Sequence, residues 1–143
     1  MEDEKIEKEL QLLAKTFKYV ADPKLDNWQI MSLTNPEGDC DDYAVTALYI
    51  VCGGSLFKFW LDILTLKAIF WHTTSPSGGP HLVLYYRGKG YIDNWDRKWV
   101  KKQELLDWGY KFNLPLIFPF PAIKMFFGVL AREFKKVSKK FKK

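Results

Sequence analysis

The first twenty residues carry apolar side chains at helical spacing. Ile6, Leu10, Leu13, Phe17 and Val20 recur at steps of three and four residues, and most positions between them are polar. Such a stripe is typical of an amphipathic helix that packs on one side. The pattern therefore predicts a helix from residue 2 to residue 20.

A long connection and a second helix follow. Residues 21–37 hold prolines and asparagines and predict irregular structure, and long connections of this kind often line functional sites. From Tyr43 to Val51 the apolar residues return to helical spacing, and Gly53-Gly54 provides a stop signal. We therefore expect Cys40 in the first turn of this helix.

The middle of the chain predicts β-structure. Residues 55–71 fit either a short helix followed by a strand or two strands. After a loop rich in serine, proline and glycine, residues 81–86 and 90–95 are two β-rich runs joined by Arg87-Gly88-Lys89, a hairpin signal. Residues 99–108 predict a strand end and a short helix.

The C-terminal segment differs from the rest of the chain in charge. It joins a proline-punctuated apolar stretch to a basic amphipathic helix whose apolar face holds Ile123, Phe126, Phe127, Leu130, Phe134 and Val137. Residues 124–143 carry eight Lys or Arg and one acidic residue, whereas the first 123 residues carry 14 basic and 16 acidic groups. The net charge of +5 thus belongs to the tail, and we divide the chain into a domain of residues 1–121 and a basic tail of residues 122–143.

The tail has two interpretations, and a third is weaker. Lysines beside a phenylalanine-rich face fit peripheral contact with an anionic membrane, and they equally fit a terminal helix that docks its aromatic face on the core. No base-reading module accompanies the charge, so we expect no specific nucleic-acid partner.

Composition indicates a packed globular protein. The 143 residues are 48% hydrophobic and 27% charged, enough for one domain that needs neither a disulfide nor a metal to fold. The acidic N-terminus lacks the pattern of a secretory signal, and no uncharged stretch reaches the length of a membrane span. We therefore expect a cytoplasmic protein in which Cys40 and Cys52 are free thiols.

Cys40 lies in the sequence Gly38-Asp39-Cys40-Asp41-Asp42-Tyr43-Ala44. A helix N-terminus stabilises a thiolate, and its backbone amides can bind an oxyanion. We also expect Gly38 to allow the tight turn that opens the sulfur to a substrate. Most single cysteines are structural, but the acidic neighbours of Cys40 argue against an apolar site, whereas Cys52 between Val51 and Gly53 fits one.

A histidine and an aspartate lie at the ends of the predicted hairpin. His81 opens its first strand and Asp93 closes its second, so the antiparallel geometry brings the two together. His72, the other histidine, has no such aspartate on a paired strand, so we favour His81. A two-residue turn would pair His81 with Asp96 instead and would place Asp93 on the opposite face. A three-residue turn or a bulge returns Asp93 to the side of His81, so both aspartates remain candidates. Thiol, imidazole and carboxylate are the three groups that a cysteine nucleophile, its base and the orienter of that base require.

The heptapeptide around Cys40 resembles the nucleophile motif of the bacterial transglutaminase-like cysteine proteinases, in which Gly-Asp-Cys-Glu-Asp-Tyr-Ala is typical. Tyr91-Ile92-Asp93-Asn94 and the histidine at the start of an apolar strand are similar to two further motifs of that family. The resemblance covers about residues 28 to 95. It implies an α+β fold of the papain-like, transglutaminase-core type, in which a cysteine-bearing helix packs on an antiparallel sheet.

The same resemblance implies a site and a reaction. Cys40 would be the nucleophile, His81 the base and Asp93 the orienter in a catalytic triad, and Trp28 or Gln29 would donate to the oxyanion. No cofactor is required, although some members bind calcium near the cysteine, which corresponds here to Asp39, Asp41 and Asp42. The expected reaction is hydrolysis of a peptide or isopeptide bond in a protein or peptide substrate through a thioester.

Two alternatives share these residues. One is acyl transfer to an amine, and the other is a non-catalytic binding protein that kept the fold. The known proteinases of this type are larger and exported, so a small version without a signal fits a phage or mobile-element protein, a toxin-like factor or a degenerate member without activity. A phage-encoded protein would be associated with the virion.

Overall fold

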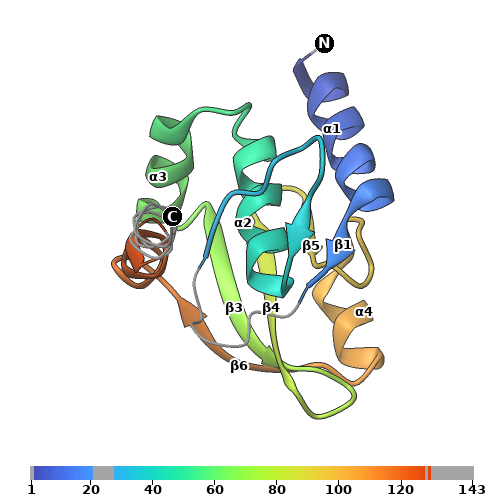
Figure 1. Cartoon of the computed structure of the whole chain (residues 1–143). Helices are drawn as coiled ribbons and strands as arrows, with labels where there is room; N and C mark the ends of the chain where they lie inside the picture. The colour runs from blue at the N-terminus through green and yellow to red at the C-terminus, as the bar shows by residue number, and fades with distance from the viewer. Residues whose placement is uncertain (1, 21–27, 128, 130–143) are drawn as a thin grey trace, which may run out of the picture.

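The computed structural model describes residues 2–20, 28–127 and 129 (Figure 1). Its elements are, in chain order, α1 (Glu2–Thr16), β1 (Lys18–Tyr19), β2 (Glu37–Gly38), α2 (Cys40–Val51), α3 (Leu56–Leu64), β3 (Ala68–Thr74), β4 (Pro80–Tyr86), β5 (Gly90–Ile92), α4 (Lys102–Asp107) and β6 (Lys111–Leu116). Residues 120–127 are also helical.

Four strands form an antiparallel sheet in the order β5-β4-β3-β6. The short strands β1 and β2 pair in parallel and join residue 18 to residue 37, just before α2. In Figure 1, α2 lies over the sheet, with α1 on one side of it and α3 on the other. The predicted α+β fold, with a cysteine-bearing helix packed on an antiparallel sheet, is confirmed.

Alternating residues of β4 contact two separate apolar clusters. Leu82 and Leu84 face α2 in the main core, where both are buried. Val83 faces the other way and packs with Leu105 of α4 and with Tyr110. Successive side chains of a strand point to opposite faces, so His81, two positions before Val83, lies on the same face as Val83 and Tyr110.

Several predicted boundaries change in the structure. The first helix ends at Thr16, and residues 55–71 resolve into helix α3 followed by the start of β3, one of the two alternatives. The second hairpin strand ends at Ile92, so Asp93 lies in a turn and not in the strand. Strand β6 was not predicted because Pro115 interrupts its sequence, yet an edge strand tolerates a proline that donates no ladder bond.

The C-terminal helix exposes part of its apolar face. Ile123, Phe126 and Phe127 are exposed, whereas Met125 packs against the main core. The expected helical residues Leu130, Phe134 and Val137 lie outside the described residues. In the described part of the chain no single helix is long and apolar enough to cross a membrane, and the one pair that passes together, α2 with α3, bends by 108°.

Candidate active site

Helix α2 begins at Cys40 because Asp39 caps it. The Asp39 Oδ1 atom accepts hydrogen bonds from the amides of Asp41 at 3.0 Å and Asp42 at 3.1 Å, and the Asp39 amide donates to Asp42 Oδ2 at 3.2 Å. This reciprocal pair is a capping box, which stabilises a helix start. The Cys40 amide takes no part in these capping bonds, so it remains a donor at the positive end of the helix.

Gly38 serves a different purpose from the one predicted. Its backbone torsion is not among the positive φ values of the described residues, so the chain does not need a glycine for the turn. A Cβ atom on Gly38 would instead lie 2.5 Å from Asp42 Oδ2 and 2.9 Å from Met31 Sδ. The glycine therefore makes room for the carboxylate that completes the capping box.

Cys40 is half-buried, and its thiol donates a hydrogen bond to Asp41 Oδ1 at 3.6 Å. Burial and, next, the negative charge of Asp41 raise the pKa of the thiol well above its ordinary value, and hydrogen bonding from the Leu82 backbone offsets only part of this rise. The prediction of a thiolate favoured by the helix N-terminus is therefore wrong for the free protein. Burial, and next the charge of the neighbouring Asp41 carboxylate, favours the thiol form of the resting cysteine.

His81 and Asp93 form a buried pair. The Nε2 atom of His81 lies 2.9 Å from Asp93 Oδ2, and Tyr110 donates its hydroxyl to the same oxygen at 2.9 Å. The other oxygen, Oδ1, accepts the amides of Trp95 at 3.2 Å and Asp96 at 2.8 Å. Burial alone would raise the pKa of Asp93, but the hydrogen bonds from His81, the Asp96 amide and Tyr110 hold it below its ordinary value. Asp93 is therefore an ionised acceptor that orients the imidazole.

The hairpin register explains why Asp93 contacts His81. Leu84 pairs with Ile92 and Tyr86 with Gly90, so the turn has three residues, 87–89. This is one of the two geometries expected to bring Asp93 to the side of His81. Asp96 contributes its backbone amide to Asp93, and burial together with the charge of Asp93 raises the pKa of the Asp96 carboxyl to about 6.

The other histidine has different hydrogen-bond partners, and it also lines one of the two cavities that meet at Cys40. His72 lies on β3, where the Asn113 side-chain amide is 3.2 Å from its Nδ1 atom. No carboxylate of the described residues pairs with it. The two histidines, nearly equivalent by sequence, thus differ in their partners.

Two cavities meet at Cys40 and His81, which line both. One has a volume of about 560 Å³ and is lined further by Tyr19, Asn94, Trp95 and Arg97. The other has a volume of about 450 Å³ and a mostly apolar wall that includes Trp28, Leu82, Leu114, Leu116 and Phe120. We call them the Arg97 cavity and the Trp28 cavity. Because both open on the thiol and the imidazole, an extended chain laid across Cys40 would enter both.

The two oxyanion candidates occupy different environments. Trp28 is buried, stacks edge-on against Phe70 and Phe120, and lines the Trp28 cavity beside Cys40. Its indole nitrogen has no hydrogen-bond partner among the described residues. Gln29 does not line either cavity, and its backbone amide donates to Asp42 Oδ1 at 3.0 Å. Of the two candidates only Trp28 therefore lines a cavity at Cys40, and its indole nitrogen is itself buried.

The acidic residues near Cys40 are engaged by neighbouring donors. Asp39 and Asp42 direct their carboxylate oxygens to backbone amides, and Asp41 accepts from the thiol. Within residues 2–20, 28–127 and 129, no group of three or more His, Cys, Asp or Glu side chains is arranged to hold a metal ion. The carboxylates of Asp39 and Asp42 thus hold the N-terminus of α2, and that of Asp41 accepts from the thiol.

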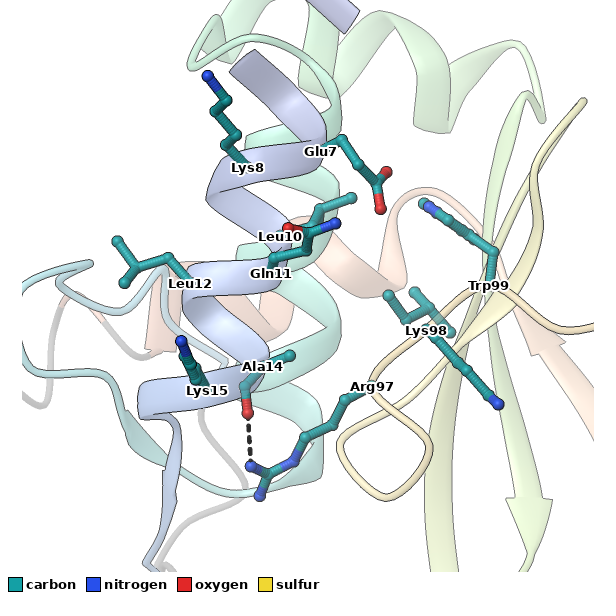
Figure 2. Close-up of a pocket in the computed structure, with 11 residues that line it drawn as sticks. Glu7, Lys8, Leu10, Gln11, Leu12, Ala14, Lys15, Arg97, Lys98 and Trp99 are labelled. Carbon is teal, nitrogen blue, oxygen red and sulfur yellow. Dashed lines mark hydrogen bonds between the residues drawn. The ribbon is translucent and has the colours of Figure 1, made fainter. Parts of the chain in front are cut away.

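Arg97 joins this site to the N-terminal helix and was not predicted. It follows the Asp93 turn, and its Nη1 atom donates to the Ala14 carbonyl of α1 at 2.8 Å (Figure 2). Its Nε atom donates to the Asn94 carbonyl at 2.6 Å, and the guanidinium lies 5.1 Å from the centre of the Phe17 ring. A groove of about 650 Å³ between α1 and residues 97–99 adjoins the Arg97 cavity at this residue. Neither Arg97 nor Tyr110 belongs to a local motif, so only the folded chain reveals them.

Solved structures share this fold. The chain is similar to two structures of LapG from Legionella pneumophila, a bacterial transglutaminase-like cysteine protease. The first, EGTA-treated, has a TM-score of 0.52 at 21% identity and covers 77% of this chain but only 60% of LapG. The second has a TM-score of 0.57 at 17% identity and covers 92% of this chain and 78% of LapG. No family model matches the sequence, and no curated protein matches it.

Proposed function

We propose that this protein is a transglutaminase-like cysteine peptidase that cleaves an amide bond through a thioester on Cys40. The observation that carries the proposal is the buried His81–Asp93 pair, which opens on the same two cavities as a cysteine at a helix N-terminus. The likeness in fold to LapG, a cysteine protease, also supports this class of enzyme.

The assigned roles follow from which atoms are already engaged. Because Nε2 of His81 is held by Asp93, Nδ1 is the nitrogen that takes the thiol proton of Cys40. The sulfur then attacks the carbonyl carbon, and a C–S bond forms as the carbonyl π-bond moves onto oxygen. The Cys40 amide and the Trp28 indole N–H donate to that oxyanion. His81 returns the proton to the leaving nitrogen as the C–N bond breaks.

A second nucleophile completes the turnover. Water, deprotonated by His81, attacks the thioester and releases the acid and the Cys40 thiol. An amine in place of the water would give acyl transfer with the same residues. Trp95 stacks on the imidazole, with ring centroids 4.5 Å apart, and limits its rotation between the two steps.

Because the pKa of the Cys40 thiol is raised, we expect the bound substrate to assist its deprotonation. A substrate that occupies the cavities displaces water around the thiol and brings the proton acceptor and the carbonyl together, so deprotonation accompanies attack. Slow alkylation of the resting thiol is therefore compatible with activity, and a test must present an acyl group or an electrophile carried by a peptide.

Covalent capture tests this proposal. A panel of peptidyl vinyl sulfones is incubated with the protein, and the labelled residue is identified by mass spectrometry. We expect labelling at Cys40 that falls at least roughly a hundredfold in His81→Gln. Cys52 is the internal control, because it is buried and hydrogen-bonded to Asp62. Equal labelling of Cys40 in the wild type and in His81→Gln would reject catalysis and would favour a non-catalytic binding protein.

A further inference from the structure

The walls of the two cavities differ in charge, and this difference bears on the substrate of the proposed peptidase. The Trp28 cavity presents apolar side chains, including Leu114 and Phe120, which are exposed in the free protein. The Arg97 cavity presents a tyrosine, an asparagine, a tryptophan and a guanidinium. A peptide that crosses Cys40 therefore meets apolar surface on one side of the scissile bond and a cation on the other.

No carboxylate of the described residues forms an ion pair with the guanidinium of Arg97. Its two protein acceptors are the neutral carbonyls of Ala14 and Asn94, and no ion pair of the described residues includes it. Arg97 is only partly exposed, and a partly buried cation without a carboxylate carries a desolvation cost that a bound anion would offset. Asp41, the acidic residue beside the thiol, lines the other cavity, so it does not occupy this position.

The direction of the peptide follows from the proton transfer. His81 must protonate the leaving nitrogen; it lines both cavities, but its stacking partner Trp95 lines only the Arg97 cavity. The oxyanion donor Trp28 lines the opposite cavity, beside the acyl carbon. The leaving segment of the substrate therefore extends over His81 toward Arg97, and the acyl segment lies against the apolar wall.

On the basis of the function proposed above, we propose that the substrate is a peptide with a bulky apolar residue on the acyl side of the cleaved bond and a Glu or Asp on the leaving side, bound by Arg97. Arg97 acts as a specificity-determining residue. Its planar guanidinium still has N–H groups for a substrate carboxylate after bonding the two carbonyls.

Matched peptides test the charge requirement without altering the protein. Internally quenched peptides carry Leu or Phe before the cleaved bond and Glu, Gln or Lys at one position after it. We expect the Glu peptides to have a kcat/KM roughly tenfold or more above that of the Gln peptides, as one charge-assisted contact would give, and the Lys peptides to be the poorest. Equal rates for Glu and Gln, or a preference with the two residues exchanged across the bond, would overturn the proposal.

Variants assign the preference to one residue. Arg97→Gln should abolish the preference for Glu over Gln, and Arg97→Lys should retain part of it. Lys98→Gln is the matched control, because Lys98 lines the groove beside α1 but not the Arg97 cavity, and it should keep the wild-type ratio. The ratio is the readout because Arg97 also bonds α1, so a general loss of stability would lower both rates together.

A binding measurement separates this proposal from the proposed chemistry. The Cys40→Ala variant is titrated with the same peptides, labelled at one end, and fluorescence anisotropy reports Kd. If no peptide is cleaved by the wild type but Cys40→Ala still binds the Glu peptides about tenfold more tightly than the Gln peptides, the proposed function fails and the recognition by Arg97 stands. If peptides are cleaved but neither kcat/KM nor Kd depends on the charge, the recognition fails alone.

Discussion

The hydroxyl of Tyr110 and the imidazole of His81 bind the same oxygen of Asp93, each at 2.9 Å. Tyr110 lies just before β6, far in sequence from the hairpin that carries the other two residues. It therefore ties the segment before β6 to the His81–Asp93 pair and gives the shared carboxylate oxygen a second donor.

Substitution of Asp93 separates orientation from stability. In Asp93→Asn the remaining oxygen is held by the amides of Trp95 and Asp96, so the new NH₂ group faces His81 Nε2 and cannot accept from it, and the favoured tautomer of the imidazole is lost. We expect kcat to fall by roughly 10²- to 10⁴-fold with little change in KM. Tyr110→Phe removes one hydrogen bond and should cost about 1 kcal/mol of stability with a much smaller loss of kcat. Similar kcat values for the two variants would argue against Asp93 as the orienter.

Gly38→Ala tests the space around the capping box. The new Cβ atom would lie 2.5 Å from Asp42 Oδ2, so either the carboxylate or the start of α2 must move. We expect a loss of about 1–3 kcal/mol in the free energy of unfolding, measured in urea. Gly79→Ala is the matched control, since its nearest neighbour would be Ser75 Oγ at 4.0 Å. Unchanged stability in Gly38→Ala would show that the N-terminus of α2 is loosely packed.

The raised pKa of Asp96 predicts that the folded protein loses stability as the pH rises from about 4 to about 6. Burial and the charge of Asp93 raise its pKa from 3.8 to about 6, so the folded state binds this proton more tightly than the unfolded state. The contribution of Asp96 is therefore most favourable below about pH 4 and is lost as the pH rises to about 6. Asp96→Asn should flatten the stability profile across this range and should be more stable than the wild type at pH 7.

Urea unfolding from pH 4 to pH 8 measures this difference. The exposed Asp107→Asn serves as the control and should follow the wild-type curve. Asp42, whose pKa burial and the charge of Asp39 raise to about 7, adds a dependence of the same sign that both variants retain. Parallel curves for the wild type and Asp96→Asn would contradict the assignment.

The exposed phenylalanines of the C-terminal helix lead to a membrane prediction. Phe126 and Phe127 are 61% and 53% exposed, and the sequence that follows them is strongly basic. We expect the protein to float with anionic phosphatidylserine vesicles and not with neutral phosphatidylcholine vesicles, and salt should release it. The paired change Phe126→Ser and Phe127→Ser should abolish flotation, whereas Leu106→Ser, an exposed apolar position on α4, should not.

Calcium should leave this protein unchanged. Because Asp39 and Asp42 already accept backbone hydrogen bonds, we expect neither added calcium nor EGTA to shift the melting temperature or the rate of Cys40 labelling. A rise in melting temperature with calcium would show that these carboxylates can leave the capping box.

Local patterns predicted those parts of the protein that depend on neighbouring residues. The start of α2 at Cys40 follows from Asp39, and the His81–Asp93 contact follows from a short hairpin whose turn length was the open question. The pKa of Cys40 was mispredicted because the charge of Asp41 and the burial against β4 act together. Arg97 and Tyr110 could not be predicted, because their contacts join residues that are 83 and 17 positions apart without any periodic signal.

The bond from Arg97 to Ala14 spans 83 positions of the chain. Contacts between such distant residues form late in folding, since the intervening chain must first be ordered. During synthesis, α1 emerges long before the segment that holds Asp93 and Arg97. A nascent chain therefore contains Cys40 before His81 and Asp93 have been synthesised, so the site that we propose is completed only after the whole sheet has formed.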